Sequence, residues 1–136
     1  MKRHVELHPL LAESILVAAR LDHPRECCGL LEGERKPDGY RITVIHPAPN
    51  LSGDPDRFEI DPLTHIKAQK LARLRGREII GCYHSHPGGR ARPSAADRLG
   101  AGEENFLWLI AGDEELAAFV YSRGEFVGAD CVMSSE

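Results

Sequence analysis

The sequence predicts one α/β domain, residues 1–136, in which helices flank a mixed β-sheet. Strand-like segments come in runs of two or three, separated by only two substantial helical segments. This order is unlike the regular alternation of a doubly wound fold. The length of 136 residues suits one domain, and 42% hydrophobic and 28% charged residues are typical of a soluble globular protein.

The first part of the chain predicts a helix and a hairpin. Apolar residues recur at helical spacing from Leu10 to Asp22, and Pro9 stands at the entry, where proline is compatible with a helix. The helix ends at His23-Pro24, because the residue before a proline avoids helical angles. Cys27 to Leu31 is typical of a short buried strand, and a polar turn connects it to a hairpin partner from Tyr40 to His46.

A second helix follows a loop that is rich in Pro, Asn, Ser and Asp (47–55). This helix starts at Asp61-Pro62 and runs to Arg75, and Gly76 occupies a position where helices commonly end. Its large apolar residues fall within one broad face, which we expect to be the buried one. They are Leu63, Ile66, Leu71 and Leu74, and the stems of Lys67 and Lys70 can lie along the same face.

The second half of the chain is predicted to supply most of the sheet. Glu78 to His84 is typical of a central strand, and a loop of Gly, Pro and Arg (87–93) leads from it to a short helix from Ser94 to Leu99. Three closing strands follow, with turn-like segments between them. We place these strands at Phe106 to Ala111, Leu116 to Tyr121 and Glu125 to Val132.

Composition and charge exclude several classes of protein. Lys plus Arg number 17 and Asp plus Glu 21, so the net charge is −4, whereas a nucleic-acid binder needs clustered positive charge. The longest aliphatic run, Ile15 to Ala19, is too short to span a bilayer, and acidic residues interrupt any signal-like stretch after Lys2-Arg3. We therefore expect a cytoplasmic protein that binds neither nucleic acid nor membrane.

The cysteines fit a reduced protein. Cys27, Cys28, Cys82 and Cys131 form no CxxC pair and show no regular spacing. A disulfide framework is not expected in a chain without an export signal, so we interpret all of them as small apolar core residues.

Charge is distributed unevenly along the chain. Eight basic residues stand against two acidic ones between Lys67 and Arg98, and acidic residues dominate after Glu103. The ordinary interpretation is a solvated helix face followed by a loop. A sharper hypothesis is that Arg90 and Arg92 dock an acidic or carboxylate-ended partner.

Residues 82–97 carry the strongest chemical signal. Alternate residues of a strand share one side, so His84 and His86 can point together, and Zn²⁺ favours neutral imidazole nitrogen. Gly88-Gly89 lets the chain turn back, so that Asp97 in the first turn of the next helix can supply an oxygen ligand. Three protein ligands leave a tetrahedral position for water, as in hydrolytic sites, where zinc lowers the pKa of that water towards about 7.

Each part of this pattern also has a simpler interpretation. An HxH pair occurs by chance on strands, and Ser94 to Asp97 matches a helix capping box. Cys82 shares the face of both histidines and can serve as a soft ligand, although core filling is its ordinary role. A nucleophilic pair of Cys27 or Cys28 with His84 is a further alternative. The other histidines that we interpret as surface or capping residues are His4, His8, His46 and His65.

The whole pattern resembles the motif of a known family. It consists of His84-x-His86-Pro87, six intervening residues, Ser94, two intervening residues and Asp97. These residues match every fixed position of HxHPx6Sx2D, the JAMM motif of the MPN-plus metallopeptidases and isopeptidases. Residues 24–33 resemble the segment that carries the catalytic glutamate of the family, and Asn50 with residues 57–62 resembles its small prokaryotic members.

The resemblance implies a role for each matched residue. His84, His86 and Asp97 would bind one Zn²⁺ ion. Glu26 would hold the zinc water and act as general base and then as proton donor to the leaving amine, and Ser94 would stabilise the oxyanion. The implied fold is the cytidine-deaminase-like MPN/JAMM domain, a mixed sheet wrapped by helices.

The resemblance also implies a substrate class. The chain has little room for the insertions with which larger members grip ubiquitin, and small prokaryotic members act on ubiquitin-like β-grasp proteins, including sulfur carriers that end in Gly-Gly. We therefore expect a zinc-dependent peptidase or isopeptidase that cleaves after the C-terminal glycine of such a protein and reads its tail by strand addition. The alternatives are a catalytically silent MPN scaffold that serves as a protein-interaction module, and a structural zinc site.

Overall fold

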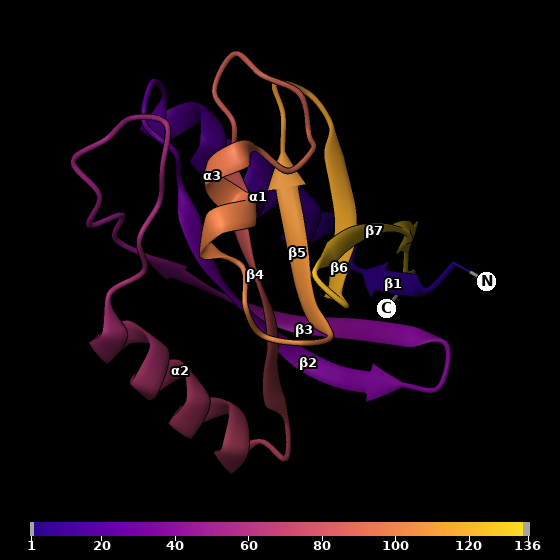
Figure 1. Ribbon diagram of the computed structural model, residues 1–136. Coiled ribbons are helices and arrows are strands. Elements are labelled where there is room, and N and C mark those ends of the chain that lie inside the picture. Colours follow the sequence, from indigo (N-terminus) through magenta and orange to yellow (C-terminus); the bar gives the residue numbers. More distant parts are fainter. Residues whose placement is uncertain (1, 135–136) are drawn as a thin grey trace.

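The computed structural model of the protein describes residues 2–134, in which a mixed sheet closes into a seven-stranded barrel (Figure 1). The strands hydrogen-bond in the order β1-β3-β2-β4-β5-β6-β7, and β7 returns to β1. The strands are β1 (His4–Leu7), β2 (Cys28–Lys36), β3 (Gly39–Ala48), β4 (Glu78–Ser85), β5 (Phe106–Ala111), β6 (Leu116–Ser122) and β7 (Glu125–Met133). The helices are α1 (Pro9–Asp22), α2 (Pro62–Leu74) and α3 (Ala95–Gly100). The mixed α/β fold is confirmed; the likeness to the cytidine-deaminase fold stays a prediction.

Strand β1, which the sequence analysis did not foresee, completes the barrel. It pairs in parallel with both β3 and β7. Val5 and Leu7 are fully buried, whereas His4 is exposed. An alternation over only 4 residues is too short to be distinguished from an irregular terminus by pattern alone.

The hairpin of β2 and β3 is longer than the sequence predicted. The predicted strand ends at Leu31, whereas β2 continues through charged residues that are rarely buried. Glu32 is nevertheless fully buried, since its carboxylate accepts hydrogen bonds from Nε and Nη2 of Arg75 and bonds to Nε2 of His46, each at 2.8 Å. His46 is therefore the partner of a buried acid, and its interpretation as a surface or capping residue is wrong.

Helix α2 lies along one flank of the barrel, beside β2 and β4 (Figure 1), and the prediction of its buried face is wrong. Ala68 and Ala72 are the buried residues of this helix. The four large apolar residues are exposed: Leu63 64%, Ile66 48%, Leu71 45% and Leu74 85%. Packing through two alanines lets the helix backbone approach the sheet closely and leaves its leucines outside.

Two apolar clusters share the strands between them. On β5, Leu107 and Leu109 pack with Ile15 of α1, whereas Trp108 packs with Ala68 and other residues on the α2 side. This alternation follows the period of two in a strand, and it places an aromatic side chain beside the end of β4. No helix within residues 2–134 is long and apolar enough to cross a membrane. The cytoplasmic location stays a prediction.

Candidate active site

The end of β4 and the start of α3 bring His84, His86 and Asp97 together. His84 is on β4, His86 follows the strand, and Asp97 is in the first turn of α3. Nε2 of His84 lies 3.0 Å from Nε2 of His86 and 3.0 Å from Oδ2 of Asp97, and Nε2 of His86 lies 3.1 Å from the same oxygen. Gly88 allows this arrangement, because its φ of 69° belongs to the left-handed region that the turn after His86 requires.

These three atoms suit a tetrahedral metal. With metal–ligand bonds of about 2.0–2.1 Å, tetrahedral donors lie about 3.3 Å apart, close to the spacing of the two imidazole nitrogens and the carboxylate oxygen. Nδ1 of His86 donates to the carbonyl of Arg90 at 3.1 Å, which leaves the lone pair of Nε2 free to bind a cation. Burial lowers the pKa of His84 and favours the neutral imidazole, the form that ligates metals.

Asp97 serves the helix and the candidate site at once. Its Oδ2 accepts a hydrogen bond from the backbone N–H of Ser94 at 2.9 Å, and Oγ of Ser94 accepts one from the Asp97 N–H at 3.1 Å. Burial raises the pKa of Asp97, but hydrogen bonds with His84 and His86 outweigh it and hold the pKa below its usual range. The capping box and the ligand geometry therefore coexist. Among the described residues Oγ of Ser94 accepts a hydrogen bond in this cap and donates none.

Glu26 lies close to the same two histidines. Its ligand atom and those of His84 and His86 lie within 4.8 Å of one another, and Glu26 is 4% exposed. Oε1 of Glu26 is buried without a hydrogen-bond partner among the described residues. Burial raises the pKa of Glu26 to about 7, against the lowering effect of His86. Its carboxyl group can therefore gain and lose a proton near neutral pH.

Two hydrogen bonds fix the segment of Glu26 against β4. The N–H of Cys27 donates to Oγ of Ser85 at 2.8 Å, and the N–H of Ser85 donates to the carbonyl of Cys27 at 3.1 Å. Ser85, which stands between the two histidines, thus holds Cys27, the residue that follows Glu26. This cross-link explains how residues nearly sixty positions apart in the sequence share one site.

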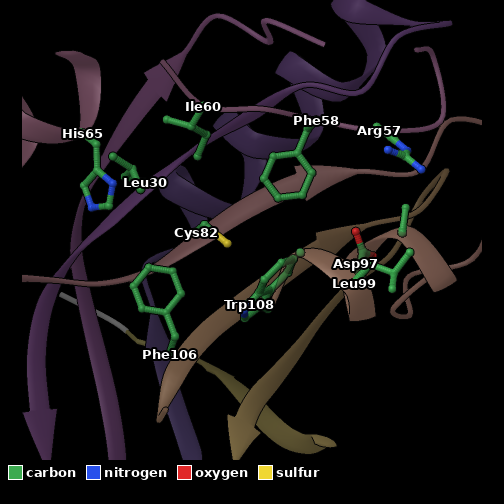
Figure 2. A pocket seen from close by; sticks show the side chains of 12 residues that line it. Leu30, Arg57, Phe58, Ile60, His65, Cys82, Asp97, Leu99, Phe106 and Trp108 are labelled. Atoms are coloured by element: carbon green, nitrogen blue, oxygen red, sulfur yellow. The ribbon is translucent and has the colours of Figure 1, made fainter. Parts of the chain in front are cut away.

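A pocket of about 420 Å³ opens beside the site. Figure 2 shows Asp97 at one end of this pocket and His65 and Phe106 at the other. Phe58 stacks on His84 with ring centroids 4.3 Å apart, and Trp108 makes a T-shaped contact with each of these two rings. The other lining residues are Leu30, Arg57, Ile60, Cys82, Ala96, Leu99 and Gly100.

The aromatic wall of this pocket, formed by Phe58 and Trp108, has no recognisable signal in the sequence. Phe58 stands within a segment that resembles the family, but a single aromatic residue in a loop carries no sign of what it contacts. Trp108 was assigned to a strand, and only its alternation with Leu107 and Leu109 indicates which side it faces. The parallel pairing of β4 with β5 brings Trp108 to His84, and the path of the loop before α2 brings Phe58 to it.

The cysteines are poorly suited to nucleophilic catalysis. Cys27, Cys28 and Cys82 are buried free thiols, and burial raises the pKa of each, that of Cys28 to about 12. A thiolate is therefore disfavoured, which speaks against a Cys–His pair. Cys131 is only partly buried. Arg90 lies on the exposed loop after His86, and the docking role of Arg90 and Arg92 stays a prediction.

Known proteins resemble the chain in sequence and in structure. A desampylase from Haloferax volcanii is 33% identical over 120 residues, which cover 84% of this chain and 85% of that protein. A probable TtuB-protein conjugate cleaving protease from Thermus thermophilus is 31% identical over 76% of this chain and 67% of its own length. The solution structure of a protein from Desulfitobacterium hafniense superposes with a TM-score of 0.88 at 31% identity, covering 97% of this chain and 94% of that one.

These similarities confirm the resemblance on which the sequence analysis relied. One of these relatives is named as a desampylase and another as a probable conjugate-cleaving protease. Their names support the prediction that this chain is a hydrolase. Residues 9–122 match the family model described as prokaryotic homologs of the JAB domain. That range spans every element from α1 to β6, including the whole candidate site. The chain therefore belongs to the family of prokaryotic JAB-domain proteins.

Proposed function

We propose that residues 1–136 form one JAMM-type domain that uses Zn²⁺ to hydrolyse the bond after the C-terminal glycine of a ubiquitin-like β-grasp protein. The observation that carries this proposal is the convergence of His84, His86 and Asp97 within 3.0–3.1 Å, with a carboxylate oxygen of Glu26 within 4.8 Å of the ligand atoms of the two histidines. A site of this composition has ligands for one metal ion and a separate acid–base group.

The surroundings of the two acids suit different roles. Oδ2 of Asp97 lies 3.0–3.1 Å from both imidazole nitrogens and is fixed by the N–H of Ser94, which suits a ligand. A carboxylate oxygen of Glu26 lies within 4.8 Å of the same imidazoles' ligand atoms, and Oε1 of Glu26 has no hydrogen-bond partner among the described residues, which suits a group that binds a water molecule. Bound Zn²⁺ supplies a Lewis acid that polarises the scissile carbonyl and lowers the pKa of water. Glu26 takes the proton from the attacking water and then delivers it to the leaving amine.

Ser94 is the candidate for stabilising the oxyanion. Its backbone N–H and its Oγ are already fixed by the capping box with Asp97, so the hydroxyl is held at the start of α3 beside the metal ligands. A hydroxyl that is oriented before the reaction loses little free energy when negative charge develops on the substrate oxygen.

The pocket supports a substrate with an extended tail. Apolar side chains line most of it, and it leads directly to Asp97, as expected for a groove that holds a residue upstream of the cleaved bond. Two glycines at the end of such a tail let the backbone pass close to the aromatic wall of Phe58 and Trp108. One relative is named as a desampylase and another as a probable TtuB-protein conjugate cleaving protease, which favours a β-grasp partner for this chain as well.

The proposal is tested by intact mass spectrometry. A small β-grasp protein that ends in Gly-Gly followed by a short extension is incubated with the zinc-loaded protein, and a parallel sample receives a chelator. We expect loss of the extension after Gly-Gly in the first sample only. Cleavage that the chelator leaves unchanged would contradict the metal-dependent mechanism, and cleavage at another bond would contradict the assigned specificity.

A further inference from the structure

The side chain of Asn50 satisfies all of its hydrogen-bonding groups between two separate segments. Nδ2 donates to the carbonyl of Glu26 at 3.0 Å and to the carbonyl of Arg57 at 2.9 Å. Oδ1 accepts from the N–H of Ser52 at 2.9 Å and from the N–H of Glu59 at 3.0 Å. Two carbonyl groups and two N–H groups surround this side chain. An amide suits them, because its NH2 group donates two hydrogen bonds and its oxygen can accept two.

Arg25 reinforces the same connection from the opposite direction. Its Nη2 donates to the carbonyls of Asn50 and Ser52, at 3.1 and 2.6 Å. The backbone on either side of Glu26 is thereby tied down: Arg25 and the Glu26 carbonyl to the loop 50–59, and Cys27 to β4. The loop and the segment that carries the proposed base form one connected unit.

The loop in turn carries the aromatic ring that covers a proposed metal ligand. Phe58 lies between Arg57 and Glu59, and Asn50 holds the backbone of both neighbours. The position of the Phe58 ring over His84, with centroids 4.3 Å apart, therefore depends on the amide of Asn50. One side chain connects Glu26 to the ring packed on His84.

We infer that Asn50 is a positioning residue that sets the relative placement of Glu26 and the Phe58–His84 stack. This inference rests on the proposed function, because it assigns Asn50 to the same hydrolytic site. Asn50 does not reach the reacting atoms itself. It acts on catalysis by holding the base segment and the aromatic cover in one geometry, and small displacements of a base reduce turnover strongly.

The decisive variant is Asn50→Asp, which has nearly the same shape. The change replaces both N–H donors of Nδ2 with a carboxylate oxygen that faces the carbonyls of Glu26 and Arg57, while the acceptor for Ser52 and Glu59 remains. Ser52→Ala is the matched control, since within residues 2–134 Oγ of Ser52 hydrogen-bonds only to the backbone of Asp54 in the same loop.

Trp108 provides a readout that needs neither metal nor turnover. It is the sole tryptophan of the chain, is 6% exposed, and has its ring 5.8 Å from that of Phe58. Release of the loop should expose the indole, so its fluorescence should become more accessible to acrylamide. A residue that merely stabilises the fold would lower the melting temperature without changing this accessibility in the folded protein.

The experiment measures cleavage of the Gly-Gly extension substrate and acrylamide quenching of the metal-free protein for the wild type and both variants. We expect Asn50→Asp to lower kcat by about tenfold or more, with a smaller change in KM, and to increase quenching, whereas Ser52→Ala leaves both near wild type. Wild-type kcat and quenching in folded Asn50→Asp would overturn the inference. An inactive wild type would instead count against the proposed function, and quenching alone would then decide the role of Asn50.

A second variant covers the case in which Asn50→Asp does not fold. Arg25→Met removes the other connection between the same two segments and should change kcat and quenching in the same direction by a smaller factor. If folded Arg25→Met matched the wild type in both measurements, the coupling between loop and base segment would be refuted.

Discussion

The ring of Phe58 lies stacked on the imidazole of His84, with centroids 4.3 Å apart and planes 20° from parallel. His84 is otherwise held by its strand, by the T-shaped contact with Trp108 and by the contacts of its Nε2 with His86 and Asp97. The stack therefore fixes the plane of a proposed metal ligand and shields it from water. A loop residue outside the recognised motif thus contributes to the centre of the site.

Phe58→Leu is expected to weaken zinc binding. A stacked aromatic pair contributes about 0.5–1.5 kcal/mol, which corresponds to a loss of roughly two- to tenfold in affinity. Competition with a chromogenic chelator measures the change. Phe119→Leu is the control, because Phe119 packs in the same apolar cluster as Trp108 without a stack on His84. Equal effects of both substitutions would argue against a specific role for the stack.

Asp97→Asn is expected to abolish stabilisation by metal while preserving the helix cap. The amide oxygen can still accept the N–H of Ser94, but it lacks the charge of a ligand carboxylate. For the wild type, zinc at a hundred times its dissociation constant should add about 2.7 kcal/mol to the free energy of unfolding, and a chelator should remove that gain. Asp113→Asn, whose Oδ1 accepts from the N–H of Gly88, should keep the response. Thermal unfolding with and without zinc distinguishes the two variants.

Stability should depend on pH through Glu32. Hydrogen bonds from Arg75 hold the pKa of Glu32 below its ordinary value of 4.5, outweighing burial, and His46 adds to the lowering. A lowered pKa stabilises the fold above pH 4.5, and this contribution is lost as the pH falls through the lowered value. Glu32→Gln should therefore cost about 1–3 kcal/mol at neutral pH and progressively less in acid.

Urea unfolding across this pH range measures the effect of Glu32. Glu34→Gln is the control. Glu34 pairs with Arg77 at 3.2 Å, but both side chains are partly exposed to solvent, Glu34 by 39% and Arg77 by 34%. An exposed pair of this kind should change the free energy of unfolding by less than about 0.5 kcal/mol. A pH-independent penalty for Glu32→Gln would contradict the ionic account.

Helix α2 should tolerate replacement of an exposed leucine better than enlargement of a buried alanine. Leu74 is 85% exposed, so Leu74→Ser should change the free energy of unfolding by less than about 0.5 kcal/mol. Ala72 is fully buried against the sheet, and Ala72→Leu should cost about 1–3 kcal/mol through overpacking. Denaturant unfolding of the two variants checks which face of the helix is buried. A larger loss of unfolding free energy for Leu74→Ser than for Ala72→Leu would contradict the assigned orientation.

The sequence was sufficient where local chemistry decides structure. Three signals act within a few residues: the proline at the start of α1, the turn after His86, and the capping box of Ser94 and Asp97. The ends of the elements beside them were therefore predicted within a residue or two. The histidine spacing likewise follows from the period of a strand. The proximity of Glu26 came only from the family resemblance.

The sequence was insufficient where a distant partner decides structure. Amphipathic spacing indicates that α2 has an apolar face, but the close approach permitted by Ala68 and Ala72 determines which face is buried. A charged Glu32 does not fit a strand interior without a partner, and that partner, Arg75, lies 43 positions away in the sequence. The pairing of β1 with β7 joins the two ends of the described chain, and no local pattern encodes it.

The most direct test compares the wild type with Glu26→Gln, each loaded with zinc, on the β-grasp protein that carries an extension after Gly-Gly. Glu26 Oε1 has no hydrogen-bond partner among the described residues, so the variant should fold and bind zinc like the wild type. Loss of the general base should slow cleavage by about 10²- to 10⁴-fold. If Glu26→Gln released the extension as fast as the wild type with the same zinc content, the assigned mechanism would be wrong.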